Sequence, residues 1–479
     1  MRDIAKEQGH FTFEIYPCGG LTPDEAQARL DTFSQLVLSG KMSSIVWYGK
    51  LWLGLIDDPE VKNLMDSLRI VTTSFLGNGQ LFDKLRERKY DLMICDATAP
   101  MCSIAAHDLL RLPYVNLANG GPLGTRYTRW MGVPSPLSYV PEYLTHFTDQ
   151  MSFPQRAKNF LMHIFSLAIF DFAILRSLET YRVELGLPTD DSVRDILGNS
   201  SLFILNWDFI LEYPRPSQAN VILAGGISTR PAQPLSGEFD EFVQGSGDDG
   251  VVIFSVSTLV NCMDPAMADM IASALAWLPM RVVWKYKGDR TPATLGNNTM
   301  LASWLPQSDL LGNNKTKVFV YHGGINGAYE ALYYGVPVVG IPLFADQVDD
   351  LLRLHSLGMG EYVHDGIHGI TSESLYQMIM KVASTPSYRE KAQEASARYR
   401  AMPQHPVDLS VFWINHVLRN GADHLRPRFG ELPWLQRTSL DAVLVLTALT
   451  TLALVTVLWA CRGLVRRSLG RPCNDAKSK

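Results

Sequence analysis

Metal-binding cysteine patterns are missing from this 479-residue chain. Its six cysteines form no Cys-x-x-Cys pair and show no spacing typical of metal ligands, so we predict no metal site. We interpret them as buried thiols, with room for one disulfide of open connectivity if the body of the protein faces an oxidising lumen. The six are Cys18, Cys95, Cys102, Cys262, Cys461 and Cys473.

Charge is also scarce along the chain. Charged residues make up 19% of the sequence against 47% hydrophobic residues, and the net charge is −5. We find no basic run in the body of the chain, which argues against a nucleic-acid partner. The composition is typical of a globular protein, and the length suits two domains of roughly 200 residues each.

A long apolar run is absent from the N-terminus and present near the C-terminus. Residues 1–17 contain no signal-peptide core, whereas residues 442–461 carry no charge and are long enough to span a bilayer. Basic residues crowd the tail over 462–479, and such a flank stays cytoplasmic. We therefore expect a single-pass membrane protein with a juxtamembrane segment over 426–441 and a lumenal or extracellular body. Sequons at Asn199, Asn297 and Asn314 agree weakly with this topology.

Such a body ordinarily needs a signal peptide. Either the anchor directs targeting, or the start of the protein is missing from this chain. A second apolar stretch, Asn159 to Leu175, is shorter than a span and carries His163 and Asp171, so we predict a buried or interfacial helix there.

Apolar strand-like runs alternate with helical patterns, which indicates an α/β fold with parallel sheets. The glycine-rich stretch Ser246 to Gly250 resembles a linker, so we predict two Rossmann-like domains, over 1–245 and 246–425, with ligands in the cleft between them. The expected strands are residues 11–17, 91–97, 113–119, 202–207, 221–226, 251–257, 281–286, 300–306, 317–324 and 337–342. Expected helices include one opened by Asp264 and Pro265 that reaches Leu278, and others over 387–402 and 408–419.

The stretch HGGINGAYE, residues 322–330, carries the most specific chemistry. A strand, a glycine turn and a helix N-terminus in succession present backbone N–H groups to an anion, and Gly323 and Gly324 allow close approach. His322, Asn326 and Glu330 follow at steps of four along one side of the helix. Histidine and asparagine donate to phosphate oxygens, and a carboxylate suits the paired hydroxyls of a ribose. The pattern therefore predicts a nucleoside diphosphate site.

Two flanking pieces fit the same ligand. Trp304 and Gln307, in WLPQ, offer an aromatic plane and an amide that can stack on a base and read its edge. Asp346 and Gln347 begin another helix and can bind sugar hydroxyls. Each piece alone is an ordinary turn or helix start. Their order within some 45 residues is what favours a site.

These stretches, WLPQ followed by VFVYHGGINGAYEALYYGVPVVGIPLFADQ, resemble the donor motif of UDP-glycosyltransferases, specifically the animal UDP-glucuronosyltransferases. The resemblance continues through NWDFILEYPRP and the anchor, so it covers nearly the whole chain. It implies a GT-B fold whose second domain binds a UDP-sugar and whose first binds a lipophilic acceptor. It also implies an enzyme of the endoplasmic reticulum membrane with a lumenal body, which uses UDP-glucuronate as co-substrate without another cofactor and makes lipophilic hydroxyl compounds water-soluble.

The resemblance assigns roles to individual residues. Trp304 and Gln307 are expected at the uracil, His322 and Asn326 at the diphosphate, Glu330 at the ribose, and Asp346 and Gln347 at the sugar. Where the family usually has FSLGS this chain has FSVST, residues 254–258, so Ser257 replaces a glycine near the phosphates while Ser255 and Thr258 offer hydroxyls. Arg215 is a candidate partner for the donor carboxylate, although it could instead brace the segment between domains.

Transfer to an alcohol needs a base for the acceptor proton. The family uses a histidine oriented by an aspartate, and Asp96 matches that aspartate unless it only caps its own turn. The histidine follows the family's first strand, which has no counterpart here, so His10 does not match it and His107 is more plausibly structural. The acceptor pocket is expected to draw on aromatic and apolar residues of the first domain, some of which could be plain core: Tyr127, Trp130, Phe153, Phe160, Met162 and Phe165.

Three functions remain open at this point. The first is glucuronosyl transfer with inversion to a lipophilic hydroxyl. The second is the same reaction with UDP-glucose or UDP-galactose. The third is a truncated, catalytically impaired form that binds intact relatives in the membrane, because without its first strand and base this chain should transfer slowly or not at all.

Overall fold

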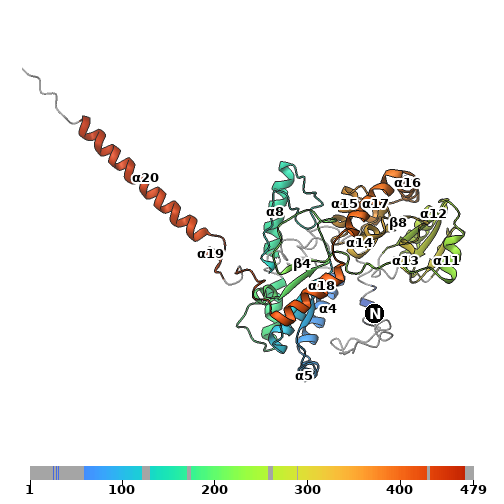
Figure 1. Ribbon diagram of the computed structural model, residues 1–479, viewed down its shortest axis with the longest axis horizontal. Coiled ribbons are helices and arrows are strands. Elements are labelled where there is room, and N and C mark those ends of the chain that lie inside the picture. The colour runs from blue at the N-terminus through green and yellow to red at the C-terminus, as the bar shows by residue number, and fades with distance from the viewer. Residues whose placement is uncertain are drawn as a thin grey trace, which may run out of the picture. The chain divides into compact units, whose positions relative to one another are not determined.

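The computed structural model describes residues 25, 28–29, 31, 59–120, 130–169, 174–256, 263–288, 290–428 and 432–469. The chain forms two compact units, Met1–Arg426 and Pro427–Lys479, and each is described by itself (Figure 1). The first unit contains two parallel sheets with helices between their strands, which confirms the predicted α/β architecture. The strand expected at residues 11–17 lies outside the described residues.

The first sheet lies inside the apolar runs predicted for it. Its described strands are parallel and follow the order β1-β2-β3-β4, with Cys95 opposite Asn116 and Leu117 opposite Ile204. The strands are β1 Met93–Asp96, β2 Tyr114–Ala118, β3 Leu202–Leu205 and β4 Val221–Leu223. The helices around it are α4 Pro59–Leu76, α5 Gly79–Glu87, α6 Pro100–Ile104, the π-helical turn Ala105–Leu110, α8 Phe153–Ile169, α9 Arg176–Glu184 and α10 Val193–Gly198.

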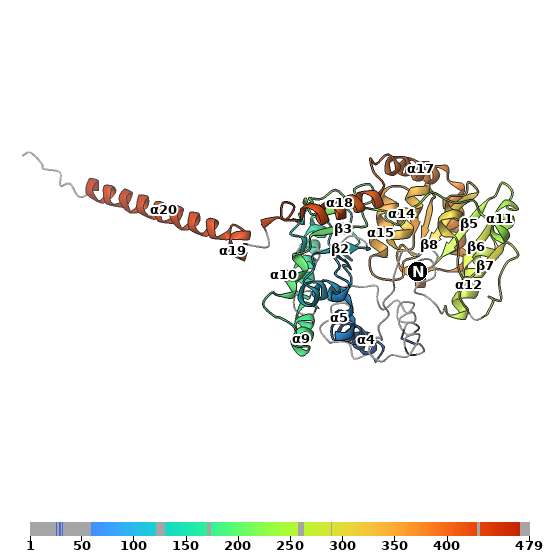
Figure 2. The same ribbon diagram turned by 60° about the horizontal axis from the view of Figure 1, so that its bottom comes forward.

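The second sheet has six strands in the order β10-β9-β8-β5-β6-β7, all parallel (Figure 2). The chain runs from β5 to β6 and β7 on one side, and then returns to β8, β9 and β10 on the other. The direction therefore reverses between β5 and β8, and in open α/β sheets ligands bind at the carboxyl ends of strands beside that point. The strands are β5 Val251–Ser255, β6 Arg281–Lys285, β7 Thr299–Ala302, β8 Thr316–Tyr321, β9 Val338–Gly340 and β10 Gly360–Tyr362.

Helices cover both faces of the second sheet, which explains why its central strands are apolar throughout. Alternate residues of β5 go to opposite faces: Val251 and Ile253 belong to one core cluster, and Val252 and Phe254 to another. One face packs against α14 and α17, and the other against α12 and α16. The helices of this half are α11 Gly237–Gln244, α12 Pro265–Ala276, α13 Gln307–Leu311, α14 Ile325–Tyr334, α15 Gln347–Ser356, α16 Ser372–Ser384, α17 Pro386–Arg400 and α18 Pro406–Asn420, with a short 3-10 turn at Gly366–Gly369.

Helix α18 returns to the first sheet after the second sheet is complete. Val417 is buried with Val115, Ile204 and Ile222, and Figures 1 and 2 both show α18 beside the first sheet. The sequence pattern predicts this helix but not its partner. The domain boundary near residue 425 stays a prediction, with the added fact that α18 packs on the first half.

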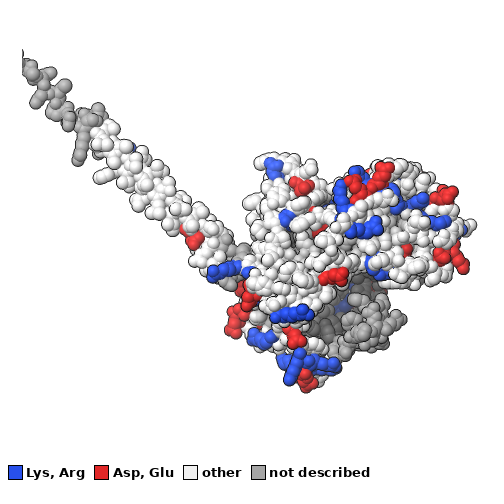
Figure 3. Space-filling model, in the orientation of Figure 1, with Lys and Arg blue, Asp and Glu red and all other residues white. Residues whose placement is uncertain are grey.

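The second unit holds the predicted membrane span. Helix α20, Leu440–Leu469, follows the short α19, Trp434–Arg437, and its segment Leu440–Val465 has a mean hydropathy of 2.3, long and apolar enough to cross a membrane. Figure 3 shows this helix almost free of charged side chains along the face in view. The expected span over 442–461 lies within it. Helix α8, which holds the second apolar stretch, is amphipathic and ends its described part at Ile169.

Candidate functional site

The glycine turn after β8 has the geometry that the motif predicts. Gly323 has φ 94°, and a Cβ there would lie 2.7 Å from the Gln347 carbonyl oxygen. Gly324 is the N-cap of α14, and a Cβ there would lie 2.6 Å from His322 Nε2. Both positions therefore require glycine. Because Gly324 has no side chain to cap α14, the first N–H groups of the helix remain open toward the turn.

His322 directly follows β8, whose last residue, Tyr321, pairs with Ser255, the buried last residue of β5. Burial lowers the pKa of His322 to about 4, the charge of Lys285 adds to this, and a hydrogen bond with the Ser255 backbone opposes it. The imidazole is therefore neutral at pH 7. Its Nδ1 is buried and has no hydrogen-bond partner among the described residues. The neighbouring Thr258 lies outside the described residues.

Asn326 joins the two sheets. Its Oδ1 accepts hydrogen bonds from Asn206 Nδ2 at 3.0 Å and from Ser228 Oγ at 3.3 Å. Asn206 follows β3, and its own Oδ1 accepts from the backbone N–H groups of Gly226 and Ile227 at 2.7 and 3.2 Å. The side-chain oxygen of Asn326 is therefore engaged, and its N–H₂ group is the part of the side chain that can donate to a ligand.

The residues predicted for the base and the ribose meet one another. Glu330 Oε2 accepts from Gln307 Nε2 at 2.5 Å, and its Oε1 accepts from the hydroxyl of Ser308. Burial raises the pKa of Glu330, and these two hydrogen bonds oppose the rise. The carboxylate is thus held in a fixed orientation at the start of α13. Ser308 is a partner that sequence reasoning missed, although it stands next to Gln307.

Trp304 offers an open ring surface. The side chain is 66% exposed, and Lys285 Nζ, at the end of β6, lies 5.0 Å from the ring centroid. Burial lowers the pKa of Lys285. The sequence does not single out this lysine, since a strand-end lysine carries no motif. Its charge acts on the indole of Trp304 and also lowers the pKa of His322.

Asp346 and Gln347 lie at the beginning of α15, after β9. Asp346 is the N-cap residue, and its Oδ2 is 3.8 Å from the position a Cβ would take on Gly120 of the first half. Gln347 Oε1 accepts from the N–H groups of Leu343 and Phe344 at 2.8 and 3.1 Å. Gln347 therefore braces the loop, while Asp346 faces the first half.

Arg215 lies in a buried ion cluster rather than alone. Its Nη2 is 3.6 Å from Glu212 Oε2, and Glu212 Oε1 is 2.7 Å from Arg353 Nε on α15. Burial lowers the pKa of Arg215. All three side chains are buried, so the cluster ties the segment after β3 to α15. This is the bracing role that the sequence left open, and contact with a donor carboxylate stays a prediction.

Asp96 is exposed at the end of β1 and caps its own turn. Its Oδ1 accepts from the N–H and the hydroxyl of Thr98 at 2.8 and 2.7 Å. Two thiols flank it. A hydrogen bond with Cys95 lowers the pKa of Cys102, a hydrogen bond with the Asp96 backbone lowers it further, and burial opposes both effects. The pKa of buried Cys95 is raised. His10, which the sequence does not match to the catalytic base, lies outside the described residues.

The predicted acceptor residues are not gathered in one place. Trp130 is buried in the core, whereas Phe153 and Phe160 on α8 are 74% and 52% exposed. Met162 and Phe165 are partly buried on the same helix, and Tyr127 lies outside the described residues. The inner side of α8 is fixed by Asn159, which accepts from the Glu142 N–H at 2.6 Å and donates to Leu137 and Val140 carbonyls at 3.0 and 2.9 Å.

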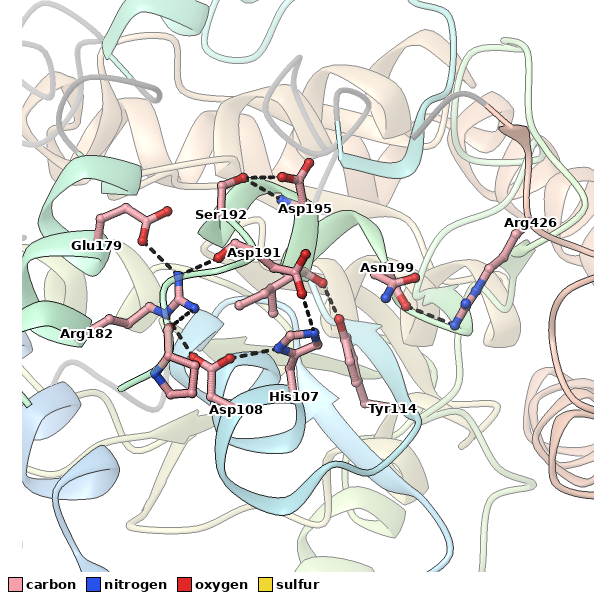
Figure 4. Close-up of polar contacts among 12 residues, drawn as sticks. His107, Asp108, Tyr114, Glu179, Arg182, Asp191, Ser192, Asp195, Asn199 and Arg426 are labelled. Carbon is pink, nitrogen blue, oxygen red and sulfur yellow. Dashed lines mark hydrogen bonds and ion pairs between the residues drawn. The ribbon is translucent and has the colours of Figure 1, made fainter. Parts of the chain in front are cut away.

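His107 belongs to a structural network, as the sequence suggested (Figure 4). Its Nδ1 is 2.8 Å from Asp108 Oδ1 and its Nε2 is 3.3 Å from Asp191 Oδ2. Asp108 Oδ2 in turn accepts from Nε of the fully buried Arg182 at 2.9 Å. Arg182 also donates to the backbone carbonyls of Pro188 and Asp191. These contacts hold the loop before α10 against the first sheet. Among the described residues no group of His, Cys, Asp and Glu could hold a metal ion.

Comparison with known proteins shows which family the chain is similar to. The family model described as "UDP-glucoronosyl and UDP-glucosyl transferase" matches residues 3–474. The chain is 34% identical to 2-hydroxyacylsphingosine 1-beta-galactosyltransferase of Homo sapiens over 467 residues, covering 97% of this chain and 82% of that protein. It is 39% identical to UDP-glucuronosyltransferase 2C1 of Oryctolagus cuniculus over 395 residues, covering 82% and 77% of the two chains.

A solved structure shares the fold. The glycosyltransferase VinC in complex with DTDP superposes with a TM-score of 0.51 at 17% identity, covering 78% of this chain and 82% of that chain. This likeness shows the GT-B fold, which confirms the expected arrangement of two Rossmann-like sheets.

Proposed function

This chain belongs to the UDP-glucuronosyl and UDP-glucosyl transferase family, and we propose that it transfers glucuronate from UDP-glucuronate to a hydroxyl of a small lipophilic acceptor. The observation that carries the proposal is the His322-Gly323-Gly324 turn. It opens the N-terminus of α14 beside the point where the strand order of the second sheet reverses. Uncapped amides and the helix dipole favour a diphosphate at that point.

The parts of a UDP-sugar fit in order along the carboxyl edge of the second sheet. The uracil stacks on the exposed face of Trp304, after β7, and the ribose hydroxyls bind Glu330, which Gln307 and Ser308 orient. The diphosphate lies between Ser255, at the end of β5, and His322, just after β8. Neutral His322 donates its single N–H to it when that proton is on Nδ1, the ring nitrogen without a partner among the described residues. The sugar reaches Asp346 after β9. Lys285 and the amide of Asn326 complete the polar surroundings.

The reaction is a displacement at the anomeric carbon with inversion. The acceptor oxygen forms a bond to this carbon while the bond to the β-phosphate oxygen breaks, and UDP leaves with the electron pair. The acceptor proton goes to a base. Asp96 is the candidate that orients this base from the end of β1, and its position on the first sheet suits an acceptor bound there. Open N–H groups at α14 stabilise the charge that develops on the leaving phosphate.

Transfer of glucose or galactose is the second candidate. One relative is named a galactosyltransferase and another a glucuronosyltransferase. The ion cluster favours a neutral sugar, because Arg215 already faces Glu212 at 3.6 Å and lies 5.3 Å from the Trp207 ring. A guanidinium engaged in this way is less free to bind a donor carboxylate. Glucuronate remains our first choice on the wider resemblance of the chain.

The second unit, which contains α20, suggests where in the cell the protein acts. We place α20 across the endoplasmic reticulum membrane, with the catalytic body in the lumen and the basic residues after 461 in the cytoplasm. UDP-sugar and a small lipophilic alcohol or phenol are the partners of the body. Association with related transferases in that membrane is a further part of the proposal.

A competition assay tests the donor. The full chain in detergent is incubated with 1-naphthol and equal amounts of UDP-glucuronate, UDP-glucose and UDP-galactose. The naphthyl glycosides are then separated by chromatography and quantified by mass spectrometry. A glucuronide as the main product supports the proposal, and a hexoside as the main product replaces it with the second candidate.

Calorimetry tests the nucleotide site independently of turnover. UDP should bind the full chain, and His322→Ala should weaken binding by roughly tenfold or more, the loss of one hydrogen bond to a charged group. His416→Ala, on α18, is the matched control and should bind as the parent does. Lack of UDP binding by a folded parent would refute the site.

A further inference from the structure

A cavity of about 420 Å³ opens beside the predicted sugar site. Its lining takes Pro342 to Ala345 from the motif stretch but none of the residues predicted to bind the donor. It is lined by the loop after β9, by the turn after β10 and by His146 from the first half. Its size falls within the roughly 300 to 1,000 Å³ of small-molecule sites. The loop after β9 also carries Asp346, so the cavity is the neighbour of the sugar position.

The strand order fixes where this cavity lies relative to the donor. Along the sheet edge the base is expected at β7, the diphosphate at β5 and β8, and the sugar at β9, and the cavity follows at β9 and β10. An inverting displacement requires the attacking oxygen on the side of the anomeric carbon opposite the leaving phosphate. Moving from β8 toward β10 leads away from that phosphate. The cavity therefore lies beyond the expected sugar position, on the side away from the expected phosphate, where an acceptor has room.

The cavity has an apolar floor and an imidazole rim. Leu343 and Ile367 are 4% and 3% exposed and form the floor. The rim carries His146, His364 and His368, which are all exposed. These residues come from segments more than 200 positions apart in sequence, so only the fold brings them together. A lipophilic ring suits the floor, and a polar substituent suits the rim.

Neighbouring contacts hold the rim in place. The His364 ring lies edge-on to Tyr362, with centroids 4.6 Å apart. His146 and Ala345 have φ values of 55° and 56°, in the left-handed region that such residues adopt only when the surroundings require it. Beside His146, the Leu144 N–H donates to Asp349 Oδ2 at 2.9 Å, which ties this loop to α15.

The charges around the rim select the polar group. Asp365 is exposed on the rim. Asp346 precedes α15, and Asp349 lies just below the His146 loop. A carboxylate ligand would meet these acids. An imidazole both donates and accepts, and a carboxylate accepts, so a neutral hydroxyl satisfies every group on the rim.

We propose that this cavity is an acceptor subsite that binds the far end of a lipophilic acceptor through a second, neutral hydroxyl. The ring system covers Leu343 and Ile367, and the second hydroxyl hydrogen-bonds to His364 or His368, while the first hydroxyl points at the sugar. The inference rests on the proposed function. It adds that the second half of the chain, through histidines outside the donor motif, selects dihydroxylated acceptors.

Binding of two matched probes to the full chain tests this inference. The probes are 1-naphthol, with one hydroxyl, and 1,5-dihydroxynaphthalene, with two, titrated in the presence of saturating UDP. The parent should bind the diol about tenfold more tightly, which is the value of one hydrogen bond. The double substitution H364A/H368A should remove this preference while leaving affinity for 1-naphthol unchanged. His405→Ala at the start of α18 is the control.

The result that overturns the proposal is equal binding of the two probes by the parent, or a diol preference that survives H364A/H368A. A third probe, 5-hydroxy-1-naphthoate, distinguishes an anion site, since tighter binding of this acid than of the diol also overturns it. UDP affinity is measured on every variant. If the parent fails to bind UDP, the proposed function fails; if UDP binds and the diol preference is absent, only the subsite fails. His368→Trp, which fills the mouth of the cavity, should weaken diol binding even if the double variant is unstable.

Discussion

The chain passes from strand to helix after both β8 and β1, but the polar groups in the two turns are satisfied differently. Each parallel strand ends in a polar residue and turns into a helix. After β8 the turn is Gly323-Gly324, and the ten-residue helix α14 begins without a side-chain cap. After β1 the carboxylate of Asp96 accepts from Thr98, and α6 has only five residues. The turn after β8 leaves the first donors of α14 open to a ligand. After β1 the Asp96 carboxylate satisfies the Thr98 N–H in the turn ahead of α6, and α6 itself begins at Pro100, which has no N–H.

This difference shows that a polar residue at the end of a strand can have two roles, ligand binding or capping of its own turn. An open helix N-terminus needs a negative partner, and one is expected in a nucleotide-binding half. A closed turn needs no ligand for stability, so a functional role for Asp96 must come from its free Oδ2 and its position. The predictions below test each end in turn.

The largest effect is expected at Gly323. Substitution Gly323→Ala places a Cβ 2.7 Å from the Gln347 carbonyl oxygen and forces alanine to φ 94°. We expect UDP affinity to fall by a hundredfold or more, and the free energy of unfolding to drop by roughly 2 to 4 kcal/mol, since strain and a backbone clash add. Calorimetry and urea unfolding measure the two effects.

A matched glycine separates the clash from the backbone strain. Gly247 also has a positive φ of 61°, yet a Cβ there meets nothing within 4 Å. Gly247→Ala should cost about 1 kcal/mol of stability and leave UDP affinity unchanged. Equal losses in both variants would contradict the idea that the turn after β8 is shaped for close approach.

His322 should act as a neutral donor. Because its pKa is lowered to about 4, we expect UDP affinity to show no histidine titration between pH 5 and pH 8. A lowered pKa means that the buried neutral form stabilises the fold above the unfolded pKa, near 6.5, and that this stability is lost as the pH falls toward 4. His322→Gln, which keeps a neutral donor, should reduce UDP affinity less than His322→Ala and should remove this loss of stability. A pH series of urea unfolding checks the sign.

At Asp96 the expected effect on stability is smaller. Asp96→Ala removes the acceptor of the Thr98 hydrogen bonds and should lower the free energy of unfolding by about 1 kcal/mol, with UDP affinity unchanged. Asp96→Asn keeps an acceptor and should retain most of that stability. If Asp96 also orients a base, both variants lose turnover, and Asn does not rescue it. If turnover instead falls only as much as stability falls, Asp96 has no role beyond capping its turn.

The smallest effect concerns the thiols around Asp96. The pKa of Cys102 is lowered by its hydrogen bond with Cys95, whose own pKa is raised by that bond and by burial. Brief treatment of the folded chain with iodoacetamide should therefore label Cys102 before Cys95, and peptide mass spectrometry reads the order. Cys95→Ala should slow labelling of Cys102 a few-fold. Preferential labelling of Cys95 would contradict the assigned hydrogen bond.

The sequence predicts well whatever depends on short range. The strands of both sheets coincide with apolar runs, Asp264 caps α12 through the N–H groups of Ala266 and Met267, and the helix expected at Asn326 begins one residue earlier. Strand β10 was missed, because Gly360–Tyr362 is three residues long and has no apolar run. This strand forms because it pairs with β9 at the edge of the sheet, and its own sequence gives no sign of that pairing.

For the candidate site, the residue types were predictable and several contacts were not. The pairing of Glu330 with Gln307 follows from a helix and a turn that meet at one sheet edge. Asn326 was expected at a phosphate, yet its Oδ1 binds Asn206, a residue 120 positions away. For Arg215 two roles were open, and the structure shows the bracing contact with Glu212, whereas contact with a donor carboxylate stays a prediction. Local pattern cannot show which polar groups will use one another as partners.

The sequence by itself determined the alternation of strands and helices, the glycine turn at 323–324 and the long apolar helix near the C-terminus, because each depends on backbone preference or on the hydrophobicity of neighbouring residues. The tertiary structure alone decided that α18 returns to the first sheet, that Asn206 reaches Asn326, and that His146 stands on one rim with His364 and His368. Such contacts join distant segments, and their geometry depends on how whole sheets pack to bury apolar surface.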